Sequence, residues 1–166
     1  FNEVAKAMKK EYGNNIHWND DPKKQPWWFV NVGATMGQMT ILHCSCSEYI
    51  MISGTPLGTE GHSGRYWHDC HDYILCGRHD TYAEGELDGV PFRPGQVTDL
   101  IRSNACGYRS KRHTYMLEYG HGLGIIFAGF WPIVSVLFNT LDFVSMAGIV
   151  YIYGTHILGN LLRGKI

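Results

Sequence analysis

The sequence predicts a mainly β, single-domain protein built around an apolar cavity, and three observations lead to that prediction. Its 166 residues are enough for one hydrophobic core of ordinary size. Hydrophobic residues make up 45% of the chain and aromatic residues 13%, whereas only 17% are charged, which excludes a disordered chain. The 20 glycines supply the turns that many short strands need.

Charge and cysteine content narrow the function classes further. The net charge is −1 and no long basic run occurs, so we expect no nucleic-acid partner. The five cysteines are an odd number without a repeated C-x-x-C, which favours buried free thiols over a disulfide framework. Because the first residue is Phe1 and not Met, we expect an upstream segment such as a signal peptide or an anchor.

We divide the chain into three parts within one domain. Residues 1–12 are predicted as an amphipathic helix that ends at Gly13. Residues 13–122 form the β-rich part, and residues 123–166 the C-terminal helices. The apolar face of the first helix has four members: Val4, Ala5, Met8 and Tyr12.

The β-rich part opens with a polar loop up to Pro26. Within the apolar segment that follows, Thr35–Tyr49 fits either a buried helix or buried strands, because its periodicity does not separate the two.

Turns and short strands are predicted for the rest of the β-rich part. The turn-rich stretches are Gly54–Gly64 and Gly85–Gly95, and the strands are Tyr73–Cys76 and several between Gln96 and Tyr119. In Thr114–Tyr119, alternation places Tyr115, Leu117 and Tyr119 on one face and Met116 and Glu118 on the other.

Two apolar stretches follow near the C-terminus. Leu123–Phe138 carries no charge, Asn139–Asp142 is typical of a helix start, and Phe143–Gly154 is again apolar. Neither stretch reaches the about 20 residues of a spanning helix, and Pro132 kinks the first. We therefore expect two helices that lie on a bilayer or cover the mouth of a barrel. Two core helices of a soluble protein are the alternative.

Histidine and cysteine are frequent enough to raise the question of a metal. They form two groups along the chain: His43, Cys44 and Cys46, and then His62, His68, Cys70, His71 and His79. Neither group has the spacing of H-E-x-x-H or of paired C-x-x-C, so we expect no metal site. The absence of G-x-S-x-G likewise gives no support to a hydrolase.

Two acids stand in apolar surroundings. Asp72 precedes Tyr73-Ile74-Leu75, and Glu118 lies inside the predicted strand Thr114–Tyr119. Each acid either faces solvent or faces inward, where it is costly unless it is protonated or paired. The sequence pattern alone leaves both orientations open.

A family resemblance bears on these acids. The motifs that carry it run in order: Trp28-Phe29-Val30-Asn31, Met36-Gly37, His43, Ser47-Glu48-Tyr49, Gly61-His62-Ser63-Gly64-Arg65-Tyr66-Trp67 with Asp72 downstream, Phe92-Arg93-Pro94-Gly95 and Met116-Leu117-Glu118-Tyr119-Gly120. Together they resemble the fungal sterol C-8 isomerases and the sigma-1 receptor over roughly residues 1–155.

The resemblance implies a fold and a setting. Members of that family have a cupin-like β-barrel that closes over an occluded apolar pocket, with two C-terminal helices flat against the membrane. Known members carry a transmembrane helix just before the position of Phe1. An endoplasmic-reticulum membrane and a trimer are further expectations from the family.

The resemblance also implies a site. Asp72 and Glu118 match two acids that face each other in the pocket, and Tyr49 matches a tyrosine that donates a hydrogen bond to the glutamate. The implied pocket walls are Met39, Ile41, Tyr66 and Tyr108. No cofactor is implied.

Three functions follow as hypotheses. The first is a sterol Δ8–Δ7 isomerase that adds and removes a proton with the acid pair. The second is a non-catalytic binder of sterols, lipids or amines of the sigma-receptor type, and the third is a structural subunit of a larger membrane complex. Two departures bear on pocket shape: Thr35 stands where the family has tryptophan, and His121 where arginine is usual.

Overall fold

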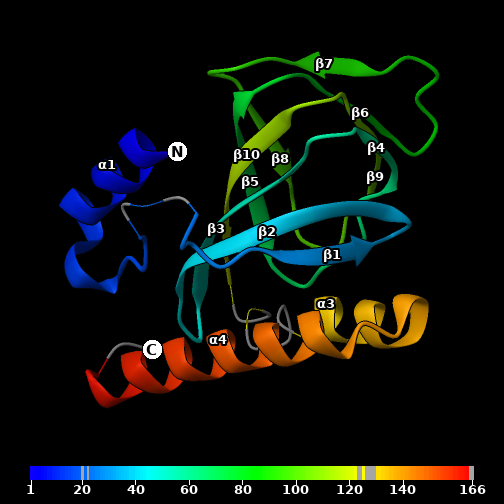
Figure 1. Cartoon of the computed structure of the whole chain (residues 1–166). Coiled ribbons are helices and arrows are strands. Elements are labelled where there is room, and N and C mark those ends of the chain that lie inside the picture. Colours follow the sequence, from blue (N-terminus) through cyan, green and yellow to red (C-terminus); the bar gives the residue numbers. More distant parts are fainter. Residues whose placement is uncertain (20, 22, 123–124, 126–129, 165–166) are drawn as a thin grey trace.

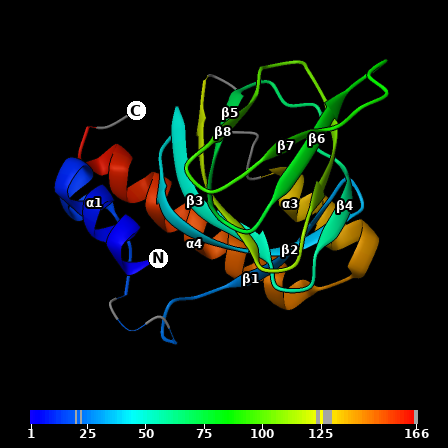
Figure 2. The same cartoon turned by 90° about the horizontal axis from the view of Figure 1, so that it is seen from above.

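The computed structural model describes residues 1–19, 21, 23–122, 125 and 130–164. Two antiparallel sheets face each other and form a barrel, with one long helix beneath it and a short helix at its side (Figure 1). The view from above shows the long helix crossing under the strands (Figure 2). Within the described ranges the mainly β prediction is confirmed.

The larger sheet has six strands in the order β1-β2-β3-β10-β5-β8, and the smaller sheet has four in the order β4-β9-β6-β7. The strands of the larger sheet are β1 (Trp28–Val32), β2 (Thr35–Cys44), β3 (Glu48–Thr55), β5 (Asp69–Cys76), β8 (Val97–Leu100) and β10 (Thr114–His121). Those of the smaller sheet are β4 (Thr59–His62), β6 (His79–Ala83), β7 (Val90–Phe92) and β9 (Cys106–Ser110).

Helix α1 (Asn2–Tyr12) forms as predicted and covers the outer face of the larger sheet. Its apolar face packs on side chains that point away from the barrel interior, among them Leu42 of β2 and Leu117 of β10. A 3₁₀ turn, η1 (Gly13–Asn15), follows where the Gly-Asn-Asn run predicted the helix end. The short helix is thus held by the burial of one apolar stripe.

The ambiguous segment Thr35–Tyr49 consists of strands. It contains β2 and the start of β3, which pair antiparallel. Strand β2 is buried on both faces, since Ile41 belongs to one hydrophobic cluster and Leu42 to the other. A strand buried on both faces loses its alternation, which explains why the sequence pattern could not identify it.

The prediction of turns over Gly54–Gly64 was wrong in part. Strand β3 continues through Gly54, and Thr59–His62 forms β4. The glycines serve close strand contacts: a Cβ on Gly54 would lie 2.3 Å from the Thr114 oxygen, and one on Gly61 2.6 Å from the Gly33 oxygen. Gly54 and Gly61 therefore mark tight packing between strands, whereas Gly58 and Gly64 have the positive φ of turns. Similarly, β7 lies inside the predicted turn stretch Gly85–Gly95.

The C-terminal part contains a short helix α3 (Phe130–Ser135), a π-helical turn η2 (Val136–Thr140) and the helix α4 (Phe143–Leu162). A helix does begin after Asn139–Asp142, but Asp142 is its cap and not an acid in its first turn. Asp142 accepts a hydrogen bond from the Ser145 amide at 2.9 Å. Much of the predicted stretch Leu123–Phe138 lies outside the described residues.

Helix α4 has an unusual distribution of polarity. Its buried face consists of Ser145, Ile149, Tyr153, His156 and Asn160. Its exposed face is apolar and includes Phe143, Val144, Tyr151, Leu158 and Leu162. The more polar face therefore points to the protein, opposite to the arrangement of a helix exposed to water. Among the described residues, no helix has both the length and the apolar character needed to cross a membrane.

All five cysteines are free thiols. The predicted burial is confirmed for Cys44 and Cys70, whereas Cys46, Cys76 and Cys106 are only partly buried.

Candidate functional site

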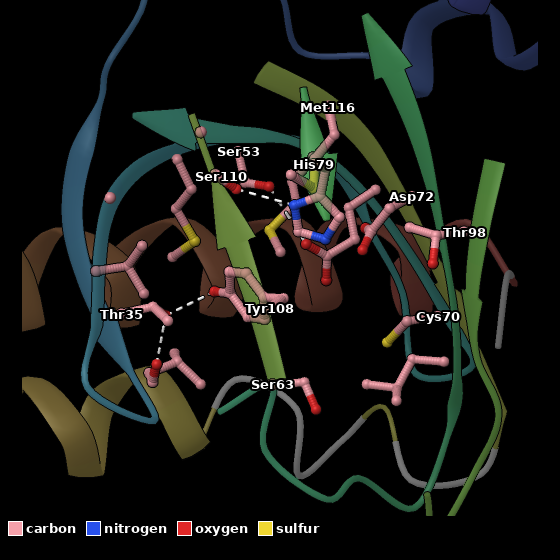
Figure 3. Close-up of a pocket in the computed structure, with 18 of the residues that line it drawn as sticks. Thr35, Ser53, Ser63, Cys70, Asp72, His79, Thr98, Tyr108, Ser110 and Met116 are labelled. Atoms are coloured by element: carbon pink, nitrogen blue, oxygen red, sulfur yellow. Dashed lines mark hydrogen bonds between the residues drawn. The ribbon is translucent and has the colours of Figure 1, made fainter. Parts of the chain in front are cut away.

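A cavity of about 160 Å³ lies between the two sheets (Figure 3). Both sheets contribute to its wall, with Asp72 of β5 and Glu118 of β10 from the larger sheet and His79 and Tyr108 from the smaller one. Tyr153 of α4 completes the lining from below. The alternation predicted for β10 explains the orientation of Glu118, because Leu117 and Tyr119 point outward to the side of α1.

The strand register brings the two acids together. In the antiparallel pairing of β10 with β5, Glu118 and Asp72 are direct partners. Side chains at directly opposite positions have their Cβ atoms about 4.5–5.5 Å apart on the same face of the sheet. Both carboxyl groups are buried and line the cavity. The inward orientation, which the sequence pattern left open, is the one the structure adopts.

The two acids differ in how they are supported. Burial raises the pKa of Asp72 well above its usual range, and the charge of Glu118 and then of Asp99 adds to this effect. Asp72 Oδ1 is buried and has no hydrogen-bond partner among the described residues. Burial also raises the pKa of Glu118, but hydrogen bonds from Tyr49 and Ser53 oppose it. The pair therefore favours a proton on Asp72 and a negative charge on Glu118.

The Tyr49 hydroxyl is the main support of Glu118. It donates to Glu118 Oε1 at 2.6 Å, and Ser53 Oγ donates to Oε2 at 3.4 Å. Because the single O–H of Tyr49 is donated to Glu118, the Tyr49 oxygen can only accept from its other two neighbours. These are His68 Nε2 and Cys70 Sγ, each at 3.3 Å. These contacts polarise the hydroxyl toward the carboxylate.

A glycine makes room for Tyr49. A Cβ on Gly120 would lie 2.2 Å from the Tyr49 ring, so the ring rests directly on the backbone of β10. Since Gly120 follows Glu118 by two residues, both positions face the cavity side of the same strand. The Glu-x-Gly spacing thus places the ring beside the carboxylate that its hydroxyl contacts.

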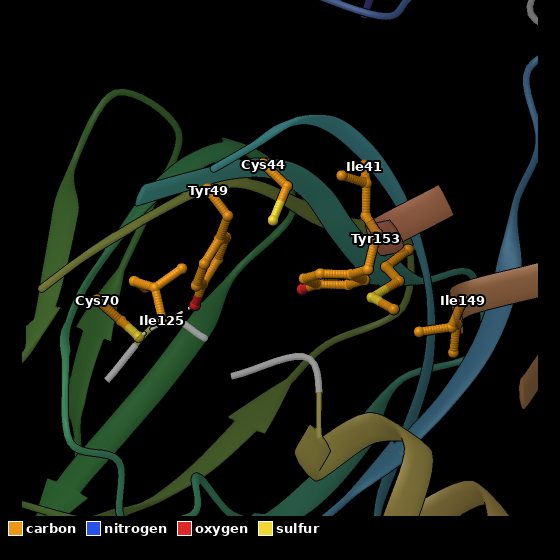
Figure 4. Packing of buried hydrophobic residues seen from close by; sticks show 8 residues of the cluster. Ile41, Cys44, Tyr49, Cys70, Ile125, Ile149 and Tyr153 are labelled. Atoms are coloured by element: carbon orange, nitrogen blue, oxygen red, sulfur yellow. Dashed lines mark hydrogen bonds between the residues drawn. The ribbon is translucent and has the colours of Figure 1, made fainter. Parts of the chain in front are cut away.

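Of the four predicted wall residues, Met39, Tyr66 and Tyr108 line the cavity, and Ile41 does not. Ile41 is fully buried in the cluster that includes Ile149 and Tyr153 of α4, so its side chain packs toward that helix (Figure 4).

Two of the wall tyrosines are fixed by hydrogen bonds. The Tyr66 hydroxyl donates to the Ser63 carbonyl at 2.7 Å, and the Tyr108 hydroxyl donates to Thr35 Oγ1 at 2.6 Å. Thr35, the residue that replaces the tryptophan of the resembling family, therefore lies in the cavity wall and holds Tyr108 in place.

Sequence reasoning missed several lining residues, above all Tyr153, His68 and His79. Tyr153 lies on the polar side of an apolar helix, a position that a search for apolar periodicity passes over. His68 and His79 are buried, and burial lowers the pKa of each to about 4. Both are therefore neutral near pH 7 and add no positive charge beside the acids. His79 Nδ1 pairs with Ser110 Oγ at 2.9 Å.

The two histidine and cysteine groups of the sequence do not converge. Over the part of the chain that the structure describes, no three His, Cys, Asp or Glu side chains are arranged to hold a metal ion. His68 and Cys70 instead contact Tyr49.

Comparisons with known sequences show the family of the chain. A sequence profile described as "ERG2 and Sigma1 receptor like protein" matches residues 1–165. The chain is 38% identical over 143 residues to the C-8 sterol isomerase of Neurospora crassa, in an alignment that covers 85% of this chain and 55% of that protein. It thus spans about half the length of this relative.

Two further relatives are aligned over more of their length. The chain is 36% identical over 167 residues to the Dictyostelium discoideum protein named "Protein erg2 homolog", with 100% of this chain and 69% of that protein covered. It is 34% identical over 158 residues to sigma non-opioid intracellular receptor 1 of Xenopus tropicalis, with 95% of this chain and 70% of that protein covered.

Among solved structures, an RmlC-like cupin from Shewanella frigidimarina is similar in fold. The TM-score is 0.52 at 10% sequence identity, and the superposition covers 64% of this chain and 93% of that one. This likeness confirms the cupin-like barrel.

Proposed function

The chain belongs to the family of ERG2- and sigma-1-receptor-like proteins, and from this premise we propose that it is a sterol Δ8–Δ7 isomerase. The observation that carries the proposal is the buried, directly opposed pair of acids, of which Asp72 favours the proton and Glu118 the charge. An acid and a base at one apolar site are what a double-bond shift by protonation and deprotonation requires.

The proposed reaction has two proton transfers. The Asp72 carboxyl gives its proton to carbon 9 of the Δ8 double bond, which leaves a carbocation at carbon 8. The Glu118 carboxylate stabilises this cation and takes a proton from carbon 7, so that the new double bond joins carbons 7 and 8. Glu118 then releases this proton to solvent, and Asp72 takes up a proton from solvent, which restores the starting state. No oxidant, reductant or cofactor is needed for this balance.

Other cavity residues take supporting roles in this proposal. Tyr49 keeps Glu118 ionised by its 2.6 Å hydrogen bond. Met39, Tyr66 and Tyr108 form walls against which a flat apolar ligand packs, and Ile41 supports the wall from the cluster behind it.

The size of the cavity limits the ligand that it can enclose. A dry cavity of about 150 Å³ holds one benzene ring, and the cavity here measures about 160 Å³. A sterol has four fused rings. The cavity in this structure is therefore too small to enclose a whole sterol.

We further propose that the protein works at a membrane, with the endoplasmic reticulum as the expected compartment. The apolar outer face of α4 supports this, as do Phe138 and Leu141 just before it, which are 75% and 66% exposed. Helix α4 contains no acid, lysine or arginine. Such a face fits a helix that lies in the interface of a bilayer, through which sterols also arrive.

One experiment tests the proposed activity. Protein in membranes is incubated with a Δ8 sterol, and the Δ7 product is followed by chromatography and mass spectrometry beside an active fungal isomerase. We expect Δ7 product from the intact protein and a loss of about 10²–10⁴-fold in rate for Asp72→Asn and Glu118→Gln. Absence of product from folded protein would reject the enzyme.

A second function, binding of amine or lipid ligands without turnover, is favoured by the carboxylate of Glu118 inside an apolar cavity. A protonated amine mimics the carbocation and pairs with that charge. Amine binding without Δ7 product from the same preparation would select this function.

A role as a structural subunit, or as a homotrimer, predicts co-purification at fixed stoichiometry, which chemical cross-linking in membranes tests.

A further inference from the structure

We infer that the outer face of the larger sheet carries a binding site for a divalent transition metal, formed by the imidazole nitrogens of His71 and His121. The site is separate from the cavity, because both residues point to the opposite face of β5 and β10 from Asp72 and Glu118. The inference does not depend on the proposed isomerase activity.

The two imidazole nitrogens are close enough to bind one metal ion. His71 Nε2 and His121 Nε2 lie 3.2 Å apart. Two imidazole nitrogens bound to one tetrahedral metal, each at 2.0–2.1 Å, are about 3.3–3.4 Å apart. The rings are nearly parallel, at 10° with centroids 5.3 Å apart. The pair is therefore already spaced to chelate one ion after a shift of only a few tenths of an ångström.

The hydrogen bond of His71 to Asp99 fixes a tautomer that suits metal binding. Its other nitrogen, Nδ1, lies 2.6 Å from Asp99 Oδ1, on the directly opposite residue of β8. The carboxylate accepts the Nδ1 proton, which leaves the lone pair on Nε2 and turns it toward His121. Metal-ligating histidines have this carboxylate partner on the far nitrogen, where it fixes the ring and raises its basicity.

The charge around the two histidines and their exposure to solvent also suit a metal ion. Asp69 is the direct cross-strand partner of His121, so a second carboxylate lies on the same face. Two carboxylates beside the two imidazole rings balance the charge of a divalent ion. His71 is 25% exposed and Asp99 55% exposed, so the site opens to solvent. The ring of Tyr119 stacks against both imidazole rings and limits their rotation. Its centroid lies 5.4 Å from that of His121 and 6.2 Å from that of His71.

The geometry points to a bidentate site whose remaining positions are filled by water. Imidazole suits zinc, nickel and copper. The Irving–Williams order then predicts tighter binding of Cu²⁺ than of Ni²⁺ or Zn²⁺. The sequence showed no metal motif because the two ligands come from strands that are distant in the chain and adjacent in the sheet.

Calorimetric titration of the whole, chelator-treated chain with ZnCl₂ and with CuCl₂ tests the site. We expect one ion per chain, a rise in the thermal unfolding temperature, and changed ¹⁵N shifts of the two Nε2 atoms. His71→Phe and His121→Phe keep a stacked ring and remove the ligand, so each should abolish this binding. Asp99→Asn should weaken it by about 10–100-fold.

His113→Asn is the matched control. His113 is exposed and has a left-handed backbone (φ 57°) that asparagine tolerates, so this variant should bind like the parent. No binding by the parent chain would overturn the inference. So would equal binding by the parent and by His121→Phe, with thermal unfolding in the absence of metal showing that both are folded.

Discussion

Removal of one hydroxyl group should change which form of Glu118 is stable. In Tyr49→Phe the 2.6 Å bond to Glu118 Oε1 is lost, and only the 3.4 Å bond from Ser53 remains. A hydrogen bond to a charged group contributes about 1.5–3 kcal/mol. Because about 1.4 kcal/mol corresponds to a tenfold change in an equilibrium constant, the ionised form of Glu118 should become about 10- to 100-fold less favoured. The pKa of Glu118 should therefore rise.

Infrared difference spectroscopy with ¹³C-labelled glutamate follows this titration directly. The protonated carboxyl band of Glu118 should appear at higher pH in Tyr49→Phe than in the parent, and Glu118→Gln assigns the band. Tyr66→Phe is the matched control: Tyr66 lines the same cavity, but its hydroxyl donates to the Ser63 carbonyl. If Glu118 titrates alike in the parent and in Tyr49→Phe, the assignment of the charge to a Tyr49-supported Glu118 is wrong.

Other perturbations have equally definite outcomes. His156 is buried, and its Nδ1 has no hydrogen-bond partner among the described residues. Burial, and to a smaller extent the charge of His17, lowers the pKa of His156 to about 4. Between pH 6.5 and about 4, the unfolded chain takes up a proton at His156 that the folded protein does not. The free energy of unfolding should therefore fall over this range, by about 2–3 kcal/mol after allowance for solvent screening. Urea unfolding at several pH values measures this loss, and His156→Leu should remove that share of it. Gly120→Ala should destabilise the protein by about 1–3 kcal/mol in the same assay, because the Tyr49 ring fills the space of the new Cβ. Gly159→Ala is the control: its new Cβ would meet no neighbouring atom within 4 Å, so this variant should be neutral or stabilising. Val144→Asp changes the exposed face of α4 and should weaken flotation of the protein with lipid vesicles. Leu87→Asp is the control, because Leu87 is 99% exposed but lies in the β6–β7 hairpin, and it should leave flotation unchanged. Equal flotation of the two variants would contradict a membrane role for α4.

Local patterns allowed part of this structure to be predicted. The apolar stripe of α1, the alternation of β10 and the approximate start of α4 each depend on neighbours within a few residues. Such signals are strong when one face is buried and the other is not. Strand β2 lacked that contrast, since α1 covers one of its faces and α4 the other.

The site was harder to predict because it depends on strand register. Nothing near Asp72 in the sequence shows that it lies opposite Glu118, and only the pairing of β5 with β10 does so. The family resemblance supplied this pair together with Tyr49. It did not supply Tyr153, whose helix turns its polar face inward, nor the contact of His68 with Tyr49.

The proposed proton transfers can be followed most directly with deuterium. Protein in membranes converts a Δ8 sterol in deuterium oxide, and the position of the label in the Δ7 product is read by mass spectrometry and NMR. If the Asp72 carboxyl adds the proton, the product carries one deuterium at carbon 9, and Asp72→Asn forms almost no product. A Δ7 product without deuterium at carbon 9, or normal turnover by Asp72→Asn, would contradict the acid-pair mechanism.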